Sequence, residues 1–385
     1  MALARCSGRV LAANVRAIDL PVFDNSSVDG FAVIAADLST TSAKRPLKLR
    51  VLADIPAGSA RKIRIRSGQS ARIMTGAPIP AGADAVVMLE DTDASRRQAG
   101  RVPPAWIRVY KTVRAGENIR KRATHLKRGQ MVLVGGRRLR PQDLGMLAML
   151  NVPSVRVFRQ PRVAILSSGN ELGVVGRPLW SGKIPDSNSH TLAALVADAG
   201  CEVLSLGIAR DQPSAIKARL DRAVHERVDL ILSSAGVSVG ALDLVRQVIE
   251  SRGRLDFWRV NVRPGKPLAV GTYRGTPFIG LPGNPVSAFV GFELFVRPAL
   301  ARLAGLAAPG QRIVHATLAE PVDCDGRESY FRAIVQESEG RFTLRLAGDQ
   351  GSASLFSLVL ANALLIIPAG VKSLAVGDRV RAWLV

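Results

Sequence analysis

The sequence predicts an α/β domain that is flanked on both sides, along the chain, by β-rich segments. In the middle of the chain, short apolar runs alternate with amphipathic stretches, a pattern typical of a parallel sheet with helices on both faces. The runs are 163–166, 202–206 and 228–232, and the stretches between them are 191–199 and 213–225. Before and after this part, alternating apolar residues punctuated by glycine and proline predict strands.

The elements expected before the α/β domain are mostly strands. Alternating patterns such as Ala71–Met74 occur between Pro21 and about Arg120, and an apolar helical pattern follows from Leu144 to Leu150. After Gly305 the chain returns to short strands, which predicts a small C-terminal β domain.

Composition limits the functions that are open to the chain. Its 385 residues, 47% of them hydrophobic, are enough for a large core, and this length predicts about two to four domains. The net charge of +22 fits an anionic partner, although a bias toward scattered arginine explains the excess equally well. Nucleic acid is not expected, because only 5% of the residues are aromatic and the sequence lacks zinc-finger spacing, an RNP-like segment and a clear helix-turn-helix pair.

Cysteine usage and hydropathy predict a location in the cytoplasm. Cys6, Cys201 and Cys324 are too few and too far apart for a disulfide framework or a zinc site, which suits a reducing compartment. No apolar run reaches about 18 residues, and the N-terminus lacks the pattern of a signal peptide. We therefore expect a soluble cytoplasmic protein without a membrane segment.

Two proline-glycine motifs in the last third of the chain predict an anion site. They are Arg263–Pro267 and Leu281–Ser287, and we expect each to close one of two neighbouring apolar strands. The first motif supplies the cations Arg263 and Lys266. In the second, Asn284 is expected to cap a helix whose first turn leaves N–H groups free for an anion. The alternative is a turn and a capped helix whose cations are only solvated.

Small-residue loops and carboxylates follow the predicted parallel strands. The loop Ser233–Asp243 has serines and glycines that let backbone N–H groups approach a phosphate, and the aspartate that ends it can hold Mg²⁺. Glu171 and Asp211 follow two other strands. Taken singly, each acid is more often a helix cap or a surface charge, as is Asp186 ahead of a helix. Together, at one sheet edge, they predict a metal-assisted site for a phosphorylated ligand.

Motifs along nearly the whole chain resemble those of one known family. They are Gly8–Ala12, Pro21–Gly30, Arg72–Pro78, Gly82–Val87 and Gly116–Arg120, followed by the loops and proline-glycine motifs described above. In this order they are similar to the molybdopterin molybdenumtransferase family, which includes the bacterial MoeA type and the E domain of gephyrin.

The resemblance implies an activity and a set of site residues. Members of the family insert molybdate into adenylylated molybdopterin, with Mg²⁺-dependent release of AMP. The implied catalytic residues are Asp29, Thr75, Glu171, Asp211 and Asp243, and the implied Mg²⁺ ligands among them are Asp243, Glu171 and Asp211. The implied substrate-binding residues are Ser168, Asn188, Ser234, Gly236, Ser238, Arg263, Gly265, Lys266, Pro282, Gly283, Asn284, Ser287, Arg327, Arg332 and Ser352.

The resemblance also implies an elongated subunit of four domains. These are a linking and dimerisation domain from 1–27 and 126–158, an inserted β-rich domain at 28–125, a doubly wound α/β molybdopterin-binding domain at 159–305 and a β-barrel at 306–385. The implied assembly is a homodimer in which Asp29 and Thr75 reach the cleft of the partner. A further implied partner is the molybdopterin adenylyltransferase that supplies the substrate.

The chain departs from the usual family pattern at several positions. They are Val28, Asn170, Ala235 and Ala123–His125. Because Met1 lies close to Gly8, we also expect the helix with which the family fold usually opens to be absent; an incorrectly assigned start codon is the alternative explanation. These departures indicate a divergent member, and Ala123–His125 favours the alternative of a non-catalytic paralogue that binds or carries molybdenum cofactor. A scaffold would need an exposed peptide groove, and a nucleic-acid protein would need its positive charge gathered on one face.

Overall fold

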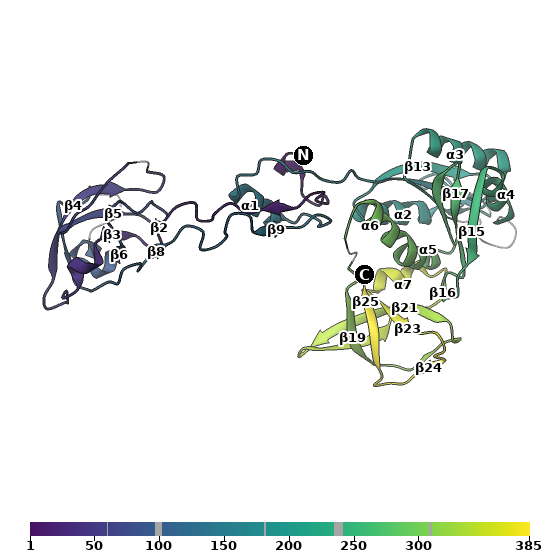
Figure 1. Ribbon diagram of the computed structural model, residues 1–385. Helices are drawn as coiled ribbons and strands as arrows, with labels where there is room; N and C mark the ends of the chain where they lie inside the picture. Colours follow the sequence, from purple (N-terminus) through teal and green to yellow (C-terminus); the bar gives the residue numbers. More distant parts are fainter. Residues whose placement is uncertain (60, 97–101, 181, 235–241, 308–309) are drawn as a thin grey trace. The chain divides into compact units, whose positions relative to one another are not determined.

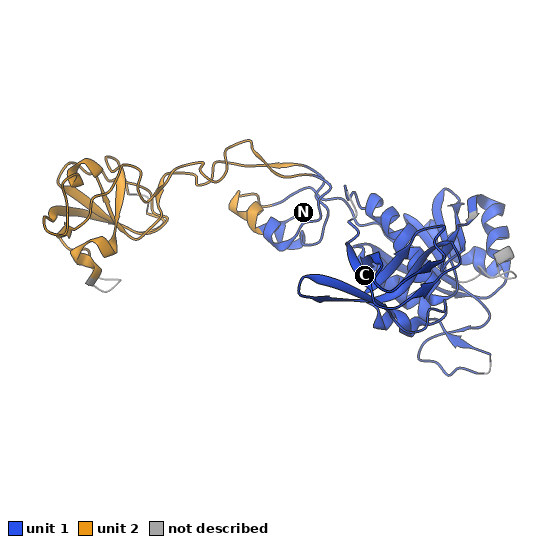
Figure 2. Ribbon diagram, turned by 90° about the horizontal axis from the view of Figure 1, so that it is seen from below, with its two compact units in different colours: residues 1–13, 135–144, 154–385 blue, residues 14–134, 145–153 orange. Residues whose placement is uncertain are grey.

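The computed structural model describes residues 1–385 except 60, 97–101, 181, 235–241 and 308–309 (Figure 1). Its contacts divide the chain into two compact units (Figure 2). Unit 1 comprises Met1–Ala13, Gly135–Leu144 and Ser154–Val385, and unit 2 comprises Asn14–Val134 and Gly145–Pro153. Each unit contains hydrophobic cores of its own.

The α/β part of unit 1 is built on a six-stranded sheet. Its strands lie in the order β13 (Glu202–Ala209), β10 (Arg162–Ser168), β14 (Leu230–Ser234), β18 (Thr276–Leu281), β17 (Pro267–Tyr273) and β15 (Gly253–Arg259). Strands β13, β10, β14 and β18 run parallel, as the alternating pattern predicts, whereas β17 and β15 are antiparallel to their neighbours. Every residue of β14 is buried, which is typical of a strand covered on both faces.

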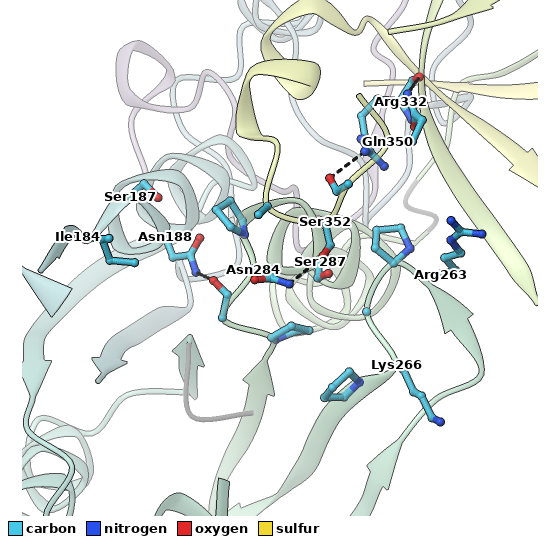
Figure 3. Close-up of a pocket in the computed structure, with 18 of the residues that line it drawn as sticks. Ile184, Ser187, Asn188, Arg263, Lys266, Asn284, Ser287, Arg332, Gln350 and Ser352 are labelled. Atoms are coloured by element: carbon cyan, nitrogen blue, oxygen red, sulfur yellow. Dashed lines mark hydrogen bonds between the residues drawn. The ribbon is translucent and has the colours of Figure 1, made fainter. Parts of the chain in front are cut away.

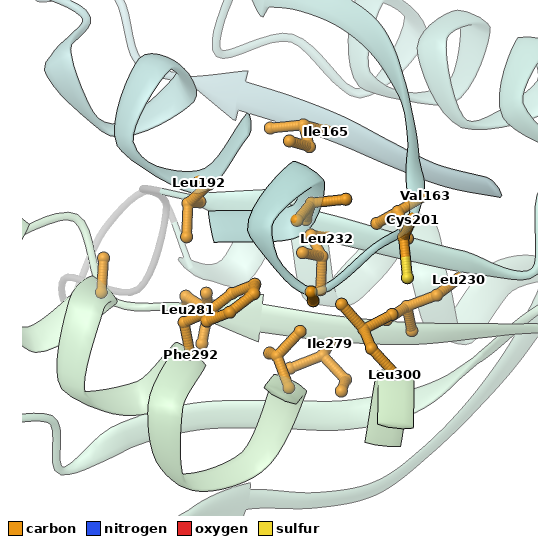
Figure 4. Close-up of a cluster of buried hydrophobic side chains, with 14 of the residues drawn as sticks. Val163, Ile165, Leu192, Cys201, Leu230, Leu232, Ile279, Leu281, Phe292 and Leu300 are labelled. Carbon is orange, nitrogen blue, oxygen red and sulfur yellow. The ribbon is translucent and has the colours of Figure 1, made fainter. Parts of the chain in front are cut away.

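Helices cover both faces of this sheet. Helices α2 (Ser187–Asp198), α5 (Pro285–Gly291) and α6 (Arg297–Leu303) pack on one face, and α3 (Pro213–His225) and α4 (Leu242–Arg252) pack on the other. On the first face, Leu192, Phe292 and Leu300 pack against strand residues such as Leu232 (Figure 4). The sheet is therefore doubly wound, as predicted.

Local signals explain where these helices begin. Helix α3 begins at Pro213, whose missing N–H is no loss at the first helical position. The carboxylate of Asp186 accepts a hydrogen bond from the Ser189 N–H at 3.1 Å and so caps α2. Between α5 and α6 the helix widens into one π-helical turn, η5 (Phe292–Val296).

The last strands of unit 1 form a closed β-barrel. Strands β21 (Glu328–Ser338), β22 (Arg341–Leu346), β19 (Ile313–Leu318), β25 (Arg379–Leu384) and β23 (Ala363–Ile367) pair in this order, and β23 also pairs with β21. Strand β16 (Val262–Arg263) pairs with β21 in parallel. Because β16 lies in the chain between β15 and β17, it joins the barrel to the α/β sheet at the first proline-glycine motif.

A shared core also joins the barrel to the α/β part. Val286 and Val290 of α5 pack against Tyr330, Leu364 and Trp383 of the barrel. The shorter elements of unit 1 are η1 (Leu3–Arg5), β11 (Leu172–Gly173) paired with β12 (Ile184–Pro185), β20 (Val322–Asp323) paired with β24 (Ser373–Leu374), and α7 (Leu355–Leu360). Helix α1 (Pro141–Met149) begins in unit 1 and ends in unit 2.

Unit 2 is built on a five-stranded sheet. Its strands lie in the order β6 (Ala85–Met88), β3 (Gly30–Val33), β5 (Gln69–Ile73), β4 (Leu47–Ile55) and β7 (Trp106–Val109). Phe31 and Ile107 belong to the core on one face, and Ala32 and Ile73 to the core on the other. The shorter elements are η2 (Ala35–Leu38), η3 (Leu89–Asp91), η4 (Asp93–Arg96), β1 (Val15–Arg16) paired with β9 (Met131–Leu133), and β2 (Asn25–Ser26) paired with β8 (Ile119–Arg120).

The predicted fold class is confirmed: a doubly wound α/β part, a β-rich sheet that precedes it in the chain and a C-terminal β-barrel. The four domain boundaries and the elongated form of the subunit stay predictions. None of the helices in the described part of the chain is long and apolar enough to cross a membrane.

Candidate active site

A cavity of about 880 Å³ lies in unit 1, between the carboxyl-end loops of the α/β sheet and the barrel (Figure 3). This volume is within the range of small-molecule sites. In Figure 3, Ile184, Ser187 and Asn188 lie on one side of the cavity, and Arg263 and Lys266 lie on the other. The predicted site residues that line it are Glu171, Asn188, Arg263, Gly265, Lys266, Pro282, Gly283, Asn284, Ser287, Arg327, Arg332 and Ser352.

The two proline-glycine motifs meet at this cavity because β17 and β18 are antiparallel. The motif Arg263–Pro267 precedes β17 and the motif Leu281–Ser287 follows β18, so the start of one strand lies beside the end of the other. The first motif follows β15 and β16, so it does close a strand, but β17 separates β15 from β18, and the expectation that the two closed strands are neighbours is wrong. The β17–β18 hairpin brings the motifs together.

The side chain of Asn284 does not cap helix α5, which corrects the prediction. Its Nδ2 instead donates a hydrogen bond to Oγ of Ser352 at 2.7 Å. The carbonyl of Ser352 accepts a hydrogen bond from the N–H of Val286 at 3.1 Å. The barrel loop that contains Ser352 therefore binds the N–H group of Val286, one of the helix N–H groups that we expected to be free for an anion. Ser287, one residue further, is buried and lines the cavity.

Arg332 brings a buried positive charge to the cavity. Its side chain is almost fully buried, with 1% exposure. Its guanidinium donates hydrogen bonds to Oγ of Ser357 at 3.0 Å and to the carbonyls of Asp349 and Gly351 at 3.1 and 3.0 Å. In the described part of the chain, no carboxylate forms an ion pair with it. Burial lowers the pKa of the guanidinium to about 10, although the carboxylate of Asp349 raises it.

Asp325 neutralises part of the positive charge on the barrel side. Its Oδ2 lies 2.5 Å from Nη2 of Arg327 and 3.6 Å from Nη1 of Arg263. The hydrogen bond from Arg327 is the main reason why the pKa of Asp325 is lowered to about 2. The guanidinium of Arg263 also lies over the ring of Phe331, 5.2 Å from its centroid. Of the two barrel arginines predicted to face an oxyanion, Arg327 is therefore paired and Arg332 is not.

Lys266 and Asn188 complete the α/β side of the cavity. Lys266 is exposed, and it has no ion pair with the carboxylates that the structure describes. Asn188 is buried, and its Nδ2 donates a hydrogen bond to the carbonyl of Gly283 at 2.7 Å. This bond fixes the start of α2 against the second proline-glycine motif.

Of the predicted acids of the α/β part, Glu171 and Asp211 have described side chains and follow the parallel strands β10 and β13, and of these two only Glu171 lines the cavity. Its carboxylate lies over Gly169, where a Cβ atom would be 2.5 and 2.6 Å from the two oxygens. Position 169 also has a φ of 151°, so both the close contact with Glu171 and the backbone conformation disfavour a side chain there. Asp211 accepts a hydrogen bond from the N–H of Asn170 at 3.0 Å, and Oδ1 of Asn170 accepts one from the Asp211 N–H at 3.2 Å.

The remaining predicted residues of the α/β part do not line the cavity or are not described. Ser168 and Ser234 are buried at the ends of β10 and β14. The hydroxyl of Ser168 has no hydrogen-bond partner. Gly236, Ser238 and the side chain of Asp243 lie outside the described residues, so their roles stay predictions.

Asp29 and Thr75 form a local pair in unit 2. Oδ1 of Asp29 accepts hydrogen bonds from the Thr75 N–H at 2.7 Å and from the Thr75 hydroxyl at 2.8 Å. These bonds, the one from the N–H first, lower the pKa of Asp29. Both side chains are exposed, and the carboxyl group of Asp29 is ionised at neutral pH. The expected place of the pair in a partner's cleft stays a prediction.

Among the described residues, no group of three or more His, Cys, Asp and Glu side chains is gathered closely enough to hold a metal ion. The predicted ligands Glu171 and Asp211 offer carboxylate oxygens, which suit Mg²⁺, and the third, Asp243, has no described side chain.

Sequence reasoning missed two residues that position the cavity's arginines. Oε1 of Gln350 accepts a hydrogen bond from the Arg332 N–H at 3.0 Å, and its Nε2 donates to the Arg332 carbonyl at 3.1 Å. Because the two residues are far apart in sequence, no local pattern indicates this contact. Asp325, two residues before Arg327, is close enough in sequence to have been found as its partner.

Three family models match this chain in order. They are described as "MoeA N-terminal region (domain I and II)" for residues 1–150, "Probable molybdopterin binding domain" for residues 164–302 and "MoeA C-terminal region (domain IV)" for residues 315–385. These matches follow the order of the sheet in unit 2, the α/β part and the barrel.

Curated relatives agree with these models over nearly the full length. The chain is 38% identical to a molybdopterin molybdenumtransferase from a Nostoc species, over 97% of this chain and 86% of the relative. It is 39% identical to molybdopterin molybdenumtransferase 2 from Mycobacterium tuberculosis, over 99% of this chain and 93% of the relative. These names give no support to the alternative of a non-catalytic carrier.

A solved structure has a similar fold. A molybdopterin biosynthesis MoeA protein from Pyrococcus horikoshii matches 100% of this chain and 94% of its own, with a TM-score of 0.82 and 32% sequence identity. The resemblance drawn from the motifs is thus confirmed, and the chain belongs to the molybdopterin molybdenumtransferase family.

Proposed function

We propose that the protein is a molybdopterin molybdenumtransferase: it inserts molybdate into adenylylated molybdopterin and releases AMP in molybdenum cofactor biosynthesis. The observation that carries this proposal is the charge of the cavity in unit 1. Lys266 and Arg332 both line it, and no described carboxylate pairs with either of them. Molybdate, the AMP phosphate and the pterin phosphate are all anions, so their binding there relieves an unfavourable concentration of positive charge.

The residues of the cavity would act by binding and orienting these anions. Arg332 is held in one orientation by its hydrogen bonds to Ser357 and to the backbone of the 349–351 loop, so little entropy is lost when it binds an oxyanion. The mobile ammonium of Lys266 provides a second charge from the α/β side. The two together would offset the repulsion between molybdate and the phosphate groups during the transfer. The reaction needs no protein nucleophile.

We propose that the reaction depends on Mg²⁺, with Glu171, Asp211 and Asp243 as candidate ligands. Support comes from the oxygen donors of Glu171 and Asp211 and from the place of Glu171 in the cavity wall. A bound Mg²⁺ ion would supply positive charge beside the phosphate groups of the substrate. Loss of activity on chelation, with recovery on adding Mg²⁺, is the expected behaviour.

We also propose that the working form is a cytoplasmic homodimer that receives its substrate from a molybdopterin adenylyltransferase. The Asp29 and Thr75 pair supports the dimer. Its carboxylate is exposed, ordered by the hydrogen bonds from Thr75 and unused by any described ion pair of unit 2.

The test is to incubate the purified protein with adenylylated molybdopterin and Mg²⁺, with and without molybdate, and to measure AMP. We expect AMP release that requires both molybdate and Mg²⁺. Replacement of Asp243 by alanine should slow the reaction by about two orders of magnitude. A protein that binds the substrate but releases no AMP under any of these conditions would contradict the proposal and favour the carrier.

A further inference from the structure

An exposed apolar segment stands beside the cavity described above. Residues 174–180, here called the rim segment, leave strand β11 and precede β12 in the chain. Trp180 is 74% exposed, Val174 59% and Val175 52%. Single exposed aliphatic residues are ordinary on protein surfaces, but a tryptophan exposed to this degree among further apolar side chains indicates a surface that contacts something.

The strands that carry the rim segment form part of the cavity wall. Strands β11 and β12 pair in parallel, with Leu172 opposite Ile184 and Gly173 opposite Pro185. Leu172, Ile184 and Pro185 all line the cavity. The rim segment is thus anchored at the cavity itself.

The rim segment folds back onto these strands. A Cβ atom on Gly173 would lie 2.4 Å from Cδ2 of Leu179, so the side chain of Leu179 covers the position that the glycine leaves open. Trp180 is the next residue in the chain. Its backbone carbonyl accepts a hydrogen bond from the Lys183 N–H at 3.1 Å, which closes the turn back toward β12. Trp180 therefore directly follows, in the chain, a residue that packs on the strands of the cavity wall.

The cavity itself offers no free aromatic surface. Among its described lining residues, Phe331 is the only aromatic one, and the guanidinium of Arg263 already lies over its ring. A substrate with a planar heterocycle would find charge and hydrogen bonds there, but no ring to stack on. The indole of Trp180 is an exposed aromatic ring of the kind that the cavity wall does not offer.

We propose that Trp180 is a specificity-determining residue whose indole stacks on a planar, nitrogen-rich heterocycle of the substrate, adenine or pterin, at the rim of the cavity. This inference rests on the proposed function, which supplies both heterocycles. Stacking on an aromatic side chain is effective for any such ring because it uses the face of the ring rather than its edge.

The test compares the wild type with Trp180→Ala and Trp180→Phe by calorimetric titration with three ligands. AMP carries adenine, molybdopterin carries the pterin, and ribose 5-phosphate carries a phosphate without a heterocycle. Trp106→Ala is the matched control, because Trp106 is also exposed but lies in the sheet of unit 2. The association state of each variant is measured by sedimentation.

We expect Trp180→Ala to weaken the binding of AMP or of molybdopterin by about tenfold or more, and Trp180→Phe to restore most of the loss. The ligand that is affected identifies the stacked ring. Ribose 5-phosphate binding should stay unchanged, and Trp106→Ala should behave as the wild type. In turnover, KM should rise more than kcat falls, because stacking holds the substrate without touching the reacting atoms.

Two results would overturn the inference. One is equal binding of all three ligands by the wild type and Trp180→Ala. The other is unchanged binding together with a change in association state, which would make the rim segment a contact between subunits. These failures are distinct from failure of the proposed function, which is judged by molybdate-dependent AMP release from the wild type.

Discussion

Arg332 shows at the scale of one residue how this fold prepares a site for an anion. Its guanidinium is buried, which is costly for a charge, and the groups that hold it are carbonyls and a hydroxyl rather than a carboxylate. Gln350 fixes the backbone of Arg332 from the other side. Such an arrangement leaves the positive charge without a counter-ion among the described carboxylates. Motif reasoning could identify Arg332 as a candidate, but its lack of a counter-ion depends on contacts distant in sequence.

The protonation of Arg332 predicts how oxyanion binding depends on pH. Burial lowers its pKa to about 10, so the free protein keeps the charge at neutral pH and loses it as the pH rises through about 10. Molybdate affinity should therefore be flat between about pH 7 and pH 9 and then fall by up to about tenfold per pH unit above pH 10. Calorimetric titrations across this range, with Arg345→Gln as a control in the same barrel, measure it. Affinity that declines already below pH 8 would assign binding to another group.

Lys266 provides the second residue-scale prediction. Lys266→Met should weaken molybdate or phosphate binding by about tenfold at low salt, because an exposed ammonium contributes charge rather than packing. The difference should shrink as salt rises to about 1 M.

The matched control for Lys266 is Lys62→Met, which removes the same charge from an exposed position in unit 2. Circular dichroism should show an unchanged fold for both variants. If Lys266→Met unfolded the protein while its folded fraction bound normally, the lysine would be structural.

At the scale of the elements, the sequence predicts the helix boundaries that depend on neighbouring residues in the chain. Helix α3 occupies the predicted residues 213–225, because Pro213 fits its first position and the apolar spacing continues to its end. Helix α2 begins at Ser187, four residues before the predicted Thr191, because Asp186 caps it. The antiparallel pairing of β17 with β18 was not predictable in this way, since it depends on the choice of partner strand.

The start of helix α1 yields a prediction about stability. Asp143 is 4% exposed and accepts hydrogen bonds from the side chain of Arg137 at 2.9 Å and from the N–H of Arg140 at 2.9 Å. Burial alone would raise the pKa of Asp143, but the bonds from Arg137 and Arg140 outweigh it and lower the pKa to about 2. This reciprocal contact with the residue ahead of the helix resembles a capping box.

The lowered pKa of Asp143 fixes the sign of the pH effect. The carboxylate stabilises the folded state fully above pH 4, and this contribution is lost as the pH falls toward 2. Asp143→Asn should therefore reduce the free energy of unfolding by about 2 kcal/mol at pH 7. Urea unfolding of both proteins should show about half of this difference at pH 3. A difference of the same size at pH 3 and pH 7 would contradict the account.

At the scale of the whole molecule, the proposed site needs more than one part of the chain. The cavity of unit 1 combines loops of the α/β sheet with the barrel, and the family motifs could identify both. Asp29 and Thr75 belong to unit 2, and their proposed role requires a second subunit. A local pattern in one chain does not indicate which of its residues enter the active site of a partner subunit, because that depends on how the subunits assemble.

The homodimer predicts that two inactive variants can complement each other. If Asp29 acts in the partner's cleft, a mixture of Asp29→Ala and Asp243→Ala proteins should regain activity, because one of the two clefts in each mixed dimer then has both residues. About a quarter of the wild-type rate is expected after full subunit exchange, which mass spectrometry verifies. Mixtures that exchange subunits and stay inactive would mean that each cleft is built within one chain.

The central claim is that this cavity transfers molybdenum to the pterin, and the direct measurement is the molybdenum content of the product. After single turnover with adenylylated molybdopterin, molybdate and Mg²⁺, the pterin product is isolated and its molybdenum and pterin are quantified. The account predicts about one molybdenum per pterin, formed in step with AMP, for the wild type and a much slower reaction for Arg332→Gln. Release of AMP with a pterin product that contains no molybdenum would contradict it.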